Sequence, residues 1–275
     1  GNNITRDDVI RNNLLVDEGD AFNELLQTKT INNLKALNFF SNVDAEIIDS
    51  ADDNKKIINI TVEEKPTGEI MAGAGFGTSG GTLGFGVSEN NFLGRGIEFG
   101  TDLSISNETI KGLISLNNPN YKGSNRSLNT SVESTVTDRL TDFGYKSSKT
   151  GFSVGSGFEF YDDLYWNTGL SAYVHDLETE ATASANVKKQ EGSYFDLYYN
   201  QSFNYDKRNQ KFKTTDGYYS RFSQNIPLIS DTYTLTNAYD YKAYNVWLNE
   251  NVASFGFHLK STNTLNDENV KLSNR

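Results

Sequence analysis

Residues 68–96, GEIMAGAGFGTSGGTLGFGVSENNFLGRG, give the clearest indication of the architecture of this chain. Apolar residues stand at alternate positions on both sides of a glycine-rich turn: Ile70, Ala72, Ala74 and Phe76, then Leu83, Phe85 and Val87. A period of two places these side chains on one face of a β-strand and leaves Gly, Ser and Thr on the other. The stretch therefore predicts an antiparallel hairpin with one apolar face.

The same alternation continues to the end of the chain in about eleven segments of roughly ten residues, with no helical pattern after Gly68. Clear examples are Ile97, Phe99, Leu103 and Ile105; Phe152, Val154, Phe158 and Phe160; Trp166, Leu170, Ala172 and Val174; Phe195, Leu197, Tyr199, Phe203 and Tyr205; and Ala253, Phe255, Phe257 and Leu259. A soluble β-sandwich would also alternate. The segment length and the aromatic residues near segment ends favour strands of a transmembrane β-barrel, with lipid outside and water inside.

The first 65 residues follow a different pattern. Thr5 and Asp8 predict the N-cap and first turn of a short helix that presents Val9, Ile10 and Leu14 on one face. Asn23 predicts the N-cap of a second helix that ends near Asn38, with its leucines turned inward: Leu25, Leu26, Leu34 and Leu37.

Two strands are expected after these helices, at residues 42–48 and 56–64, joined by the polar turn at residues 50–54. Their alternating residues are Val43, Ala45 and Ile47 in the first strand, and Ile58, Ile60 and Val62 in the second. Lys65-Pro66 marks a boundary, because the residue before proline is driven into extended geometry. The sequence thus predicts a small α+β domain at residues 1–65, lacking its first strand, and a barrel portion at residues 66–275.

Composition excludes several functions. A formal net charge of -11 does not suit a nucleic-acid partner, and with Cys 0 the chain has neither a thiolate nucleophile nor a cysteine metal site. His175 and His258 stand in separate strands without metal-ligand spacing, as polar residues of the lumen or rim. We expect no enzyme activity, no metal and no cofactor.

Four motifs in order resemble the BamA-type outer-membrane assembly factors. They are LKALNFFSNVDAEI at residues 34–47, the stretch at 68–96 with its Asn-aromatic-Leu-Gly-x-Gly turn, LNNPNYKG at 116–123, and YDKRNQKFKTTDGYY at 205–219. Lys213-Thr214 departs from the usual Pro-Thr of the last motif, and the chain ends before the family's Arg-Gly-Phe motif.

The resemblance implies an outer-membrane location in Gram-negative bacteria, with the N-terminal domain in the periplasm. It implies that this domain is the last of several POTRA domains, and that the strands are about eleven of a sixteen-stranded barrel. Unfolded outer-membrane proteins would be the clients, outer-membrane lipids the surroundings and accessory assembly lipoproteins the partners. The implied function is folding and insertion of β-barrel proteins.

The run GAGFGTSGG at residues 73–81 carries the mechanistic hypothesis. It is no P-loop, because neither Lys-Ser/Thr nor a helix follows the glycines. Either glycine fills a crowded inner face, or the first strand is weakly paired and forms a seam that opens to incoming strands. The predicted seam residues are Ile70, Met71, Ala72, Gly73, Ala74, Gly75, Phe76 and Gly77.

A second strand edge is expected in the small domain, where it would bind unfolded clients or partner lipoproteins. Its residues are Val43, Asp44, Ala45, Glu46, Ile47 and Ile48. Lys65 and Pro66 are the predicted hinge, and a plain spacer is the alternative role for the domain. Other functions remain open for the whole protein. They are a two-partner secretion pore, a passive porin and a soluble β-sandwich binding protein. The helical pattern at the start of the chain argues against the porin.

Overall fold

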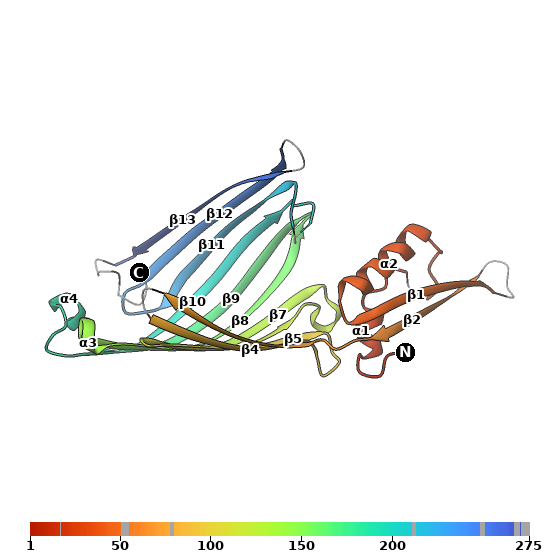
Figure 1. The fold of residues 1–275 in the computed structure, drawn as a ribbon. Helices are drawn as coiled ribbons and strands as arrows, with labels where there is room; N and C mark the ends of the chain where they lie inside the picture. Colours follow the sequence, from red (N-terminus) through yellow and green to blue (C-terminus); the bar gives the residue numbers. More distant parts are fainter. Residues whose placement is uncertain are drawn as a thin grey trace.

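The computed structural model describes residues 1–16, 18–50, 55–77, 80–210, 213–247, 251–266 and 270. It shows two parts, a small α/β domain and a large antiparallel sheet that curves into an open trough (Figure 1). The small domain lies at one end of the trough. The sheet is not closed within the described residues.

The small domain contains α1 (Asp7–Arg11), α2 (Glu24–Ala36), β1 (Phe40–Asp49) and β2 (Lys56–Glu64). The two strands pair antiparallel, and α2 packs on one side of them. The buried side chains of its core are Leu34, Phe39, Phe40, Val43 and Val62. Val9, Ile10 and Leu14 are partly buried and pack against this core. The bounds predicted for the second strand are confirmed.

Two predictions about the helices are corrected. Thr5 is not the N-cap of α1, because Arg6 holds that position and Thr5 is buried against the sheet instead. Leu25 is 64% exposed, because the buried face of α2 is set by Gln27, Thr30 and Leu34, and Leu25 lies off that face. The N-cap at Asn23 is confirmed, since its side chain accepts from the backbone N–H groups of the first turn.

The predicted alternation in β1 fails beyond Val43. Ala45 and Ile47 are both exposed, because the β1–β2 hairpin projects past the helices that would cover it (Figure 1). Within the predicted turn at residues 50–54, residues 51–54 lie outside the described part of the chain.

Eleven strands form the large sheet, in the order of the chain. They are β3 (Gly68–Gly77), β4 (Gly80–Phe92), β5 (Ile97–Ser106), β6 (Thr109–Asn118), β7 (Arg126–Arg139), β8 (Tyr145–Tyr161), β9 (Leu164–Thr179), β10 (Gly192–Asp206), β11 (Gly217–Ile229), β12 (Thr234–Val246) and β13 (Val252–Thr264). Register aligns the predicted apolar positions, as in Ala72 opposite Phe85 and Phe85 opposite Leu103. The predicted number of strands is confirmed, as is the prediction that the apolar residues of neighbouring strands share one face.

Strand length departs from the prediction of about ten residues. Strands β3, β5 and β6 have 10 residues each, but β8, β9 and β10 have 17, 16 and 15. The extra residues are mostly polar on both faces, so they carry no apolar alternation. The longer strands reach beyond what a tilted span of the bilayer requires.

Short helices interrupt the strand region, contrary to the prediction. They are η1 (Tyr121–Gly123), α3 (Leu140–Phe143) and α4 (Ala185–Lys188). The last two lie at the end of the trough away from the small domain (Figure 1). No helix in the described ranges combines the length and the apolar character needed to cross a bilayer.

Candidate functional site

Strand β3 lies at an edge of the sheet and contains all the predicted seam residues. Within the described residues it pairs only with β4, which leaves its second row of backbone N–H and C=O groups unpaired. All ten of its residues are exposed, including Phe76 at 95% and Ile70 at 76%. Unpaired strand edges are in general templates for another strand, and the seam role of β3 stays a prediction.

The polar face of β3 carries almost no side chains toward β4. Gly73 stands opposite Gly84, and Met71 stands opposite Gly86. A Cβ added at Gly73, Gly75 or Gly77 would meet nothing within 4 Å. Crowding within the described residues therefore does not require these glycines, and on its polar face the hairpin has few of the cross-strand side-chain pairs that stabilise sheets.

Strands β9 and β10 show the opposite character. On the apolar face the rings of Trp166 and Phe203 stack, with centroids 6.1 Å apart and planes 4° apart. On the polar face Asn200 donates to Ser171 at 2.8 Å. Side chains connect the two strands on both faces of this hairpin, so the pairing of β9 with β10 does not depend on backbone hydrogen bonds alone.

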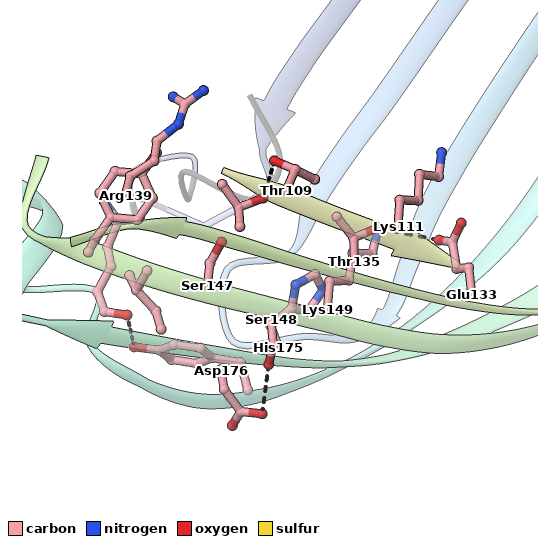
Figure 2. Close-up of a pocket in the computed structure, with 15 residues that line it drawn as sticks. Thr109, Lys111, Glu133, Thr135, Arg139, Ser147, Ser148, Lys149, His175 and Asp176 are labelled. Atoms are coloured by element: carbon pink, nitrogen blue, oxygen red, sulfur yellow. Dashed lines mark hydrogen bonds and ion pairs between the residues drawn. The ribbon is translucent and has the colours of Figure 1, made fainter. Parts of the chain in front are cut away.

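A polar pocket of about 490 Å³ lies on the polar face of β6 to β10 and gathers Lys111, Glu133, Arg139, Lys149 and His175 (Figure 2). The Lys149 ammonium lies 3.8 Å from the centre of the Tyr173 ring and 4.0 Å from a Glu133 oxygen. The Arg139 Nε atom donates to Glu108 at 2.7 Å. These charges are largely compensated by neighbours, which suits a structural role in the wall.

Both histidines pair with an aspartate on the neighbouring strand. His175 Nε2 lies 3.2 Å from Asp196 Oδ2, and Ser230 donates to the other oxygen of Asp196 at 2.5 Å. His258 Nδ1 lies 2.6 Å from Asp240 Oδ1. The sequence placed the histidines on the polar face, but their partners follow only from the register between strands.

The β4–β5 turn anchors the root of the β3–β4 hairpin to the small domain. Asn91 donates to the Thr5 hydroxyl at 2.8 Å, and the Arg6 N–H donates to the Gly94 carbonyl at 2.8 Å. Gly94 has φ +67°, and a Cβ there would come within 1.9 Å of the Ile4 carbonyl oxygen. This contact therefore requires glycine at position 94, which sequence reasoning did not identify.

Glu64 at the end of β2 completes the anchor. Its carboxylate accepts from the backbone N–H groups of Asn3, Ile4 and Thr5, at 2.7 Å for Asn3 and 2.6 Å for Thr5. Burial raises the pKa of Glu64, but the hydrogen bonds outweigh burial and lower the pKa to about 2. The ionised carboxylate thus fixes the segment that carries Thr5.

The two other predicted sites are placed as follows. The 43–48 edge lies in β1, which pairs with β2 on one side only among the described residues; Val43 is buried, whereas Ile47 and Ile48 are 41% and 40% exposed. Lys65 donates its backbone N–H to the Phe39 carbonyl at 3.0 Å. The edge role and the hinge at Lys65-Pro66 stay predictions.

Comparison with known proteins decides the family. A model described as the Omp85 superfamily domain matches residues 91–275. The chain belongs to the Omp85 superfamily. A second match, the POTRA model described as a surface antigen variable number repeat, covers residues 1–65. The chain is thus an outer-membrane protein whose POTRA domain lies in the periplasm.

Relatives within the Omp85 superfamily agree with the predicted resemblance. Outer membrane protein assembly factor BamA of Nitratidesulfovibrio vulgaris is 24% identical over 79% of this chain and 27% of its own length. The chain thus spans about a quarter of that relative. The crystal structure of Haemophilus ducreyi BamA lacking POTRA domains 1–3 has a TM-score of 0.76 at 21% identity, covering 96% of this chain and 54% of that one.

A more distant fold likeness is CdiB from Acinetobacter baumannii. It has a TM-score of 0.57 at 10% identity, covering 95% of this chain and 51% of that chain. The POTRA-plus-barrel fold of the Omp85 superfamily is therefore shared more closely with BamA than with CdiB.

Proposed function

We propose that this protein folds and inserts β-barrel proteins into the outer membrane, using β3 as the template for incoming strands. The glycine face of β3, which adds almost no side-chain contacts to the pairing with β4, is the observation that carries the proposal. Each unpaired backbone group facing lipid is penalised by several kcal/mol unless another strand pairs with it. An unfolded outer-membrane client supplies such a strand, and the backbone bonds require no particular client sequence.

The mechanism needs no covalent chemistry, metal or cofactor. The client gains hydrogen bonds along β3, and weak pairing between β3 and β4 lets the edge adjust to it. Outer-membrane lipids surround the apolar face, and the β1 edge serves accessory lipoproteins or early client contacts. A two-partner secretion pore or a passive porin would make no use of a weak first strand.

Cysteine crosslinking tests the template directly. In the full-length protein, a cysteine at Ala72 or Ala74 should form a disulfide with an arrested client strand, because these residues lie on the edge. A cysteine at Ala172, on the same face but inside the sheet on β9, is the matched control. If no cysteine along β3 forms a disulfide with the client, β3 is not the template for incoming strands.

Reconstitution tests the function itself. Liposomes that contain the full-length protein should convert an unfolded barrel client to the protease-resistant form faster than empty liposomes do. Equal rates would overturn the assembly function, whereas faster folding without crosslinks would keep the function and reject the β3 mechanism.

A further inference from the structure

A cleft of about 900 Å³ separates the α/β domain from the adjoining rim of the sheet. It is formed by α1, α2, the β4–β5 and β6–β7 turns, and the ends of β8 and β9 near the small domain. Eight of its 22 lining residues are asparagines, and three are charged: Arg95, Glu98 and Glu159. This lining contrasts with the charged pocket on the same face of the sheet.

Three of the asparagine side chains are available to a ligand. The carboxamides of Asn12, Asn33 and Asn90 have no hydrogen-bond partner among the residues that the structure describes. They face the cleft from α1's end, α2 and β4 respectively. A carboxamide offers two N–H donors and an acceptor oxygen, the same groups that a peptide bond presents.

We propose that this cleft binds an extended, unfolded polypeptide through its backbone, before the polypeptide reaches β3. The proposal rests on the function proposed above and names an earlier contact of the same client. Backbone recognition by carboxamides is independent of client sequence. Apolar residues between the asparagines, such as Leu37 and Tyr165, give client side chains a surface to contact.

Charge and position favour a polypeptide over other ligands. With one arginine and two glutamates, the cleft lacks the surplus of positive charge that lipid phosphates or nucleic acids require. The Asn90 N–H donates to the Thr67 carbonyl at 3.3 Å, immediately before β3 begins at Gly68. A chain that leaves the cleft at Asn90 is therefore near the residue at which β3 begins.

Two neighbouring residues of α2 provide a matched test. Asn32 and Asn33 are both exposed, but only Asn33 lines the cleft. In detergent-solubilised full-length protein, a denatured barrel client carrying one cysteine should form at least about tenfold more disulfide with Asn33→Cys than with Asn32→Cys. Equal yields of disulfide at the two positions would overturn the proposal. It would also be overturned if Asn33→Cys formed a disulfide with a folded protein and not with the denatured client.

A peptide probe tests the backbone chemistry. A strand-length peptide of about ten residues should compete with the client at Asn33→Cys, a scrambled peptide should compete equally, and a backbone N-methylated peptide should compete at least about tenfold less well. In an otherwise unchanged protein, Asn12→Leu/Asn33→Leu/Asn90→Leu should weaken peptide binding about tenfold, while the corresponding Gln triple variant retains it. Equal competition by the N-methylated peptide would reject backbone recognition.

The outcome is separable from that of the proposed function. Crosslinking in detergent requires no insertion, so a cleft adduct without liposome activity would uphold the cleft and reject the assembly function. Liposome activity with no difference between positions 32 and 33 would do the reverse.

Discussion

The β3–β4 and β9–β10 hairpins belong to one sheet but differ in what holds them together. Opposite Gly73 stands Gly84, whereas opposite Trp166 stands Phe203 with its ring stacked. Both hairpins have a full backbone ladder, so side chains make the difference. The contrast indicates that pairing strength varies around the wall and is lower in the β3–β4 hairpin than in the β9–β10 hairpin.

The weak hairpin is held at its root. The Gly94 and Asn91 contacts to the small domain, with Glu64 behind them, fix the end of β4 while β3 stays exposed. The strand that we propose as the client template is thus attached to the small domain at one end. This arrangement predicts distinct effects for changes at the root, in the hairpin and in the stronger wall.

Breaking the root should have the largest effect. Gly94→Val places a β-branched residue at φ +67° and drives its Cβ into the Ile4 carbonyl. We expect the docking contact to weaken by about 3 kcal/mol, seen as roughly 100-fold faster hydrogen exchange at the Arg6 amide. Gly123→Val is the control, because it has the same φ of +67° but only an ordinary contact at 3.5 Å.

Filling the glycine face should remove the contrast. Gly73→Thr/Gly84→Thr adds a cross-strand pair in open space and should strengthen the β3–β4 hairpin by about 2 kcal/mol. Client insertion in liposomes should slow about tenfold or more. Gly112→Thr, in open space on an interior strand, should leave the rate nearly unchanged; slowing by that control would show a general effect of rigidity.

Acid should loosen the root through Glu64. Because the folded-state pKa is lowered from 4.5 to about 2, its contribution is complete above pH 4.5 and is lost as the pH falls through about 2. Exchange protection of the Asn3 and Thr5 amides, corrected for intrinsic rates, should fall about tenfold between pH 4.5 and 3. Glu64→Gln should lack this pH dependence, and an unchanged profile would contradict the assignment.

Truncating one aromatic ring in each hairpin should give the smallest effect. Phe203→Ala removes a stacked ring pair and should lower the free energy of unfolding by about 1 kcal/mol. Phe76→Ala, at a side chain 95% exposed, should change it by less than about 0.5 kcal/mol. Denaturant unfolding in detergent measures both, and equal losses would refute the contrast.

The sequence predicted most of the fold because apolar alternation is a local signal. It located eleven strands and both faces, and the strand at 56–64 to the residue. It missed the length of β8 to β10 and the helices α3 and α4, since polar residues beyond the apolar band carry no periodicity. Leu25 shows a further limit, because an apolar residue near a helix start need not face the core.

The candidate site was predictable only in part. The glycines of β3 and the edge were visible in the sequence, whereas the contact between Thr5 and Asn91 joins residues 86 positions apart. Thr5 instead suggested an N-cap, a local use of the same hydroxyl. The asparagine-lined cleft arises from helices and turns that are distant in sequence, so no motif indicated it.

Hydrogen exchange of the full-length protein in a bilayer would measure how weakly β3 is paired with β4. Amides of β3 and β4 that bond to each other should exchange at least about tenfold faster than the corresponding amides between β9 and β10. In the Gly73→Thr/Gly84→Thr variant, the exchange rates of the β3–β4 amides should fall to those of the β9–β10 amides. Equal protection of both hairpins in the unaltered protein would contradict a weak edge strand.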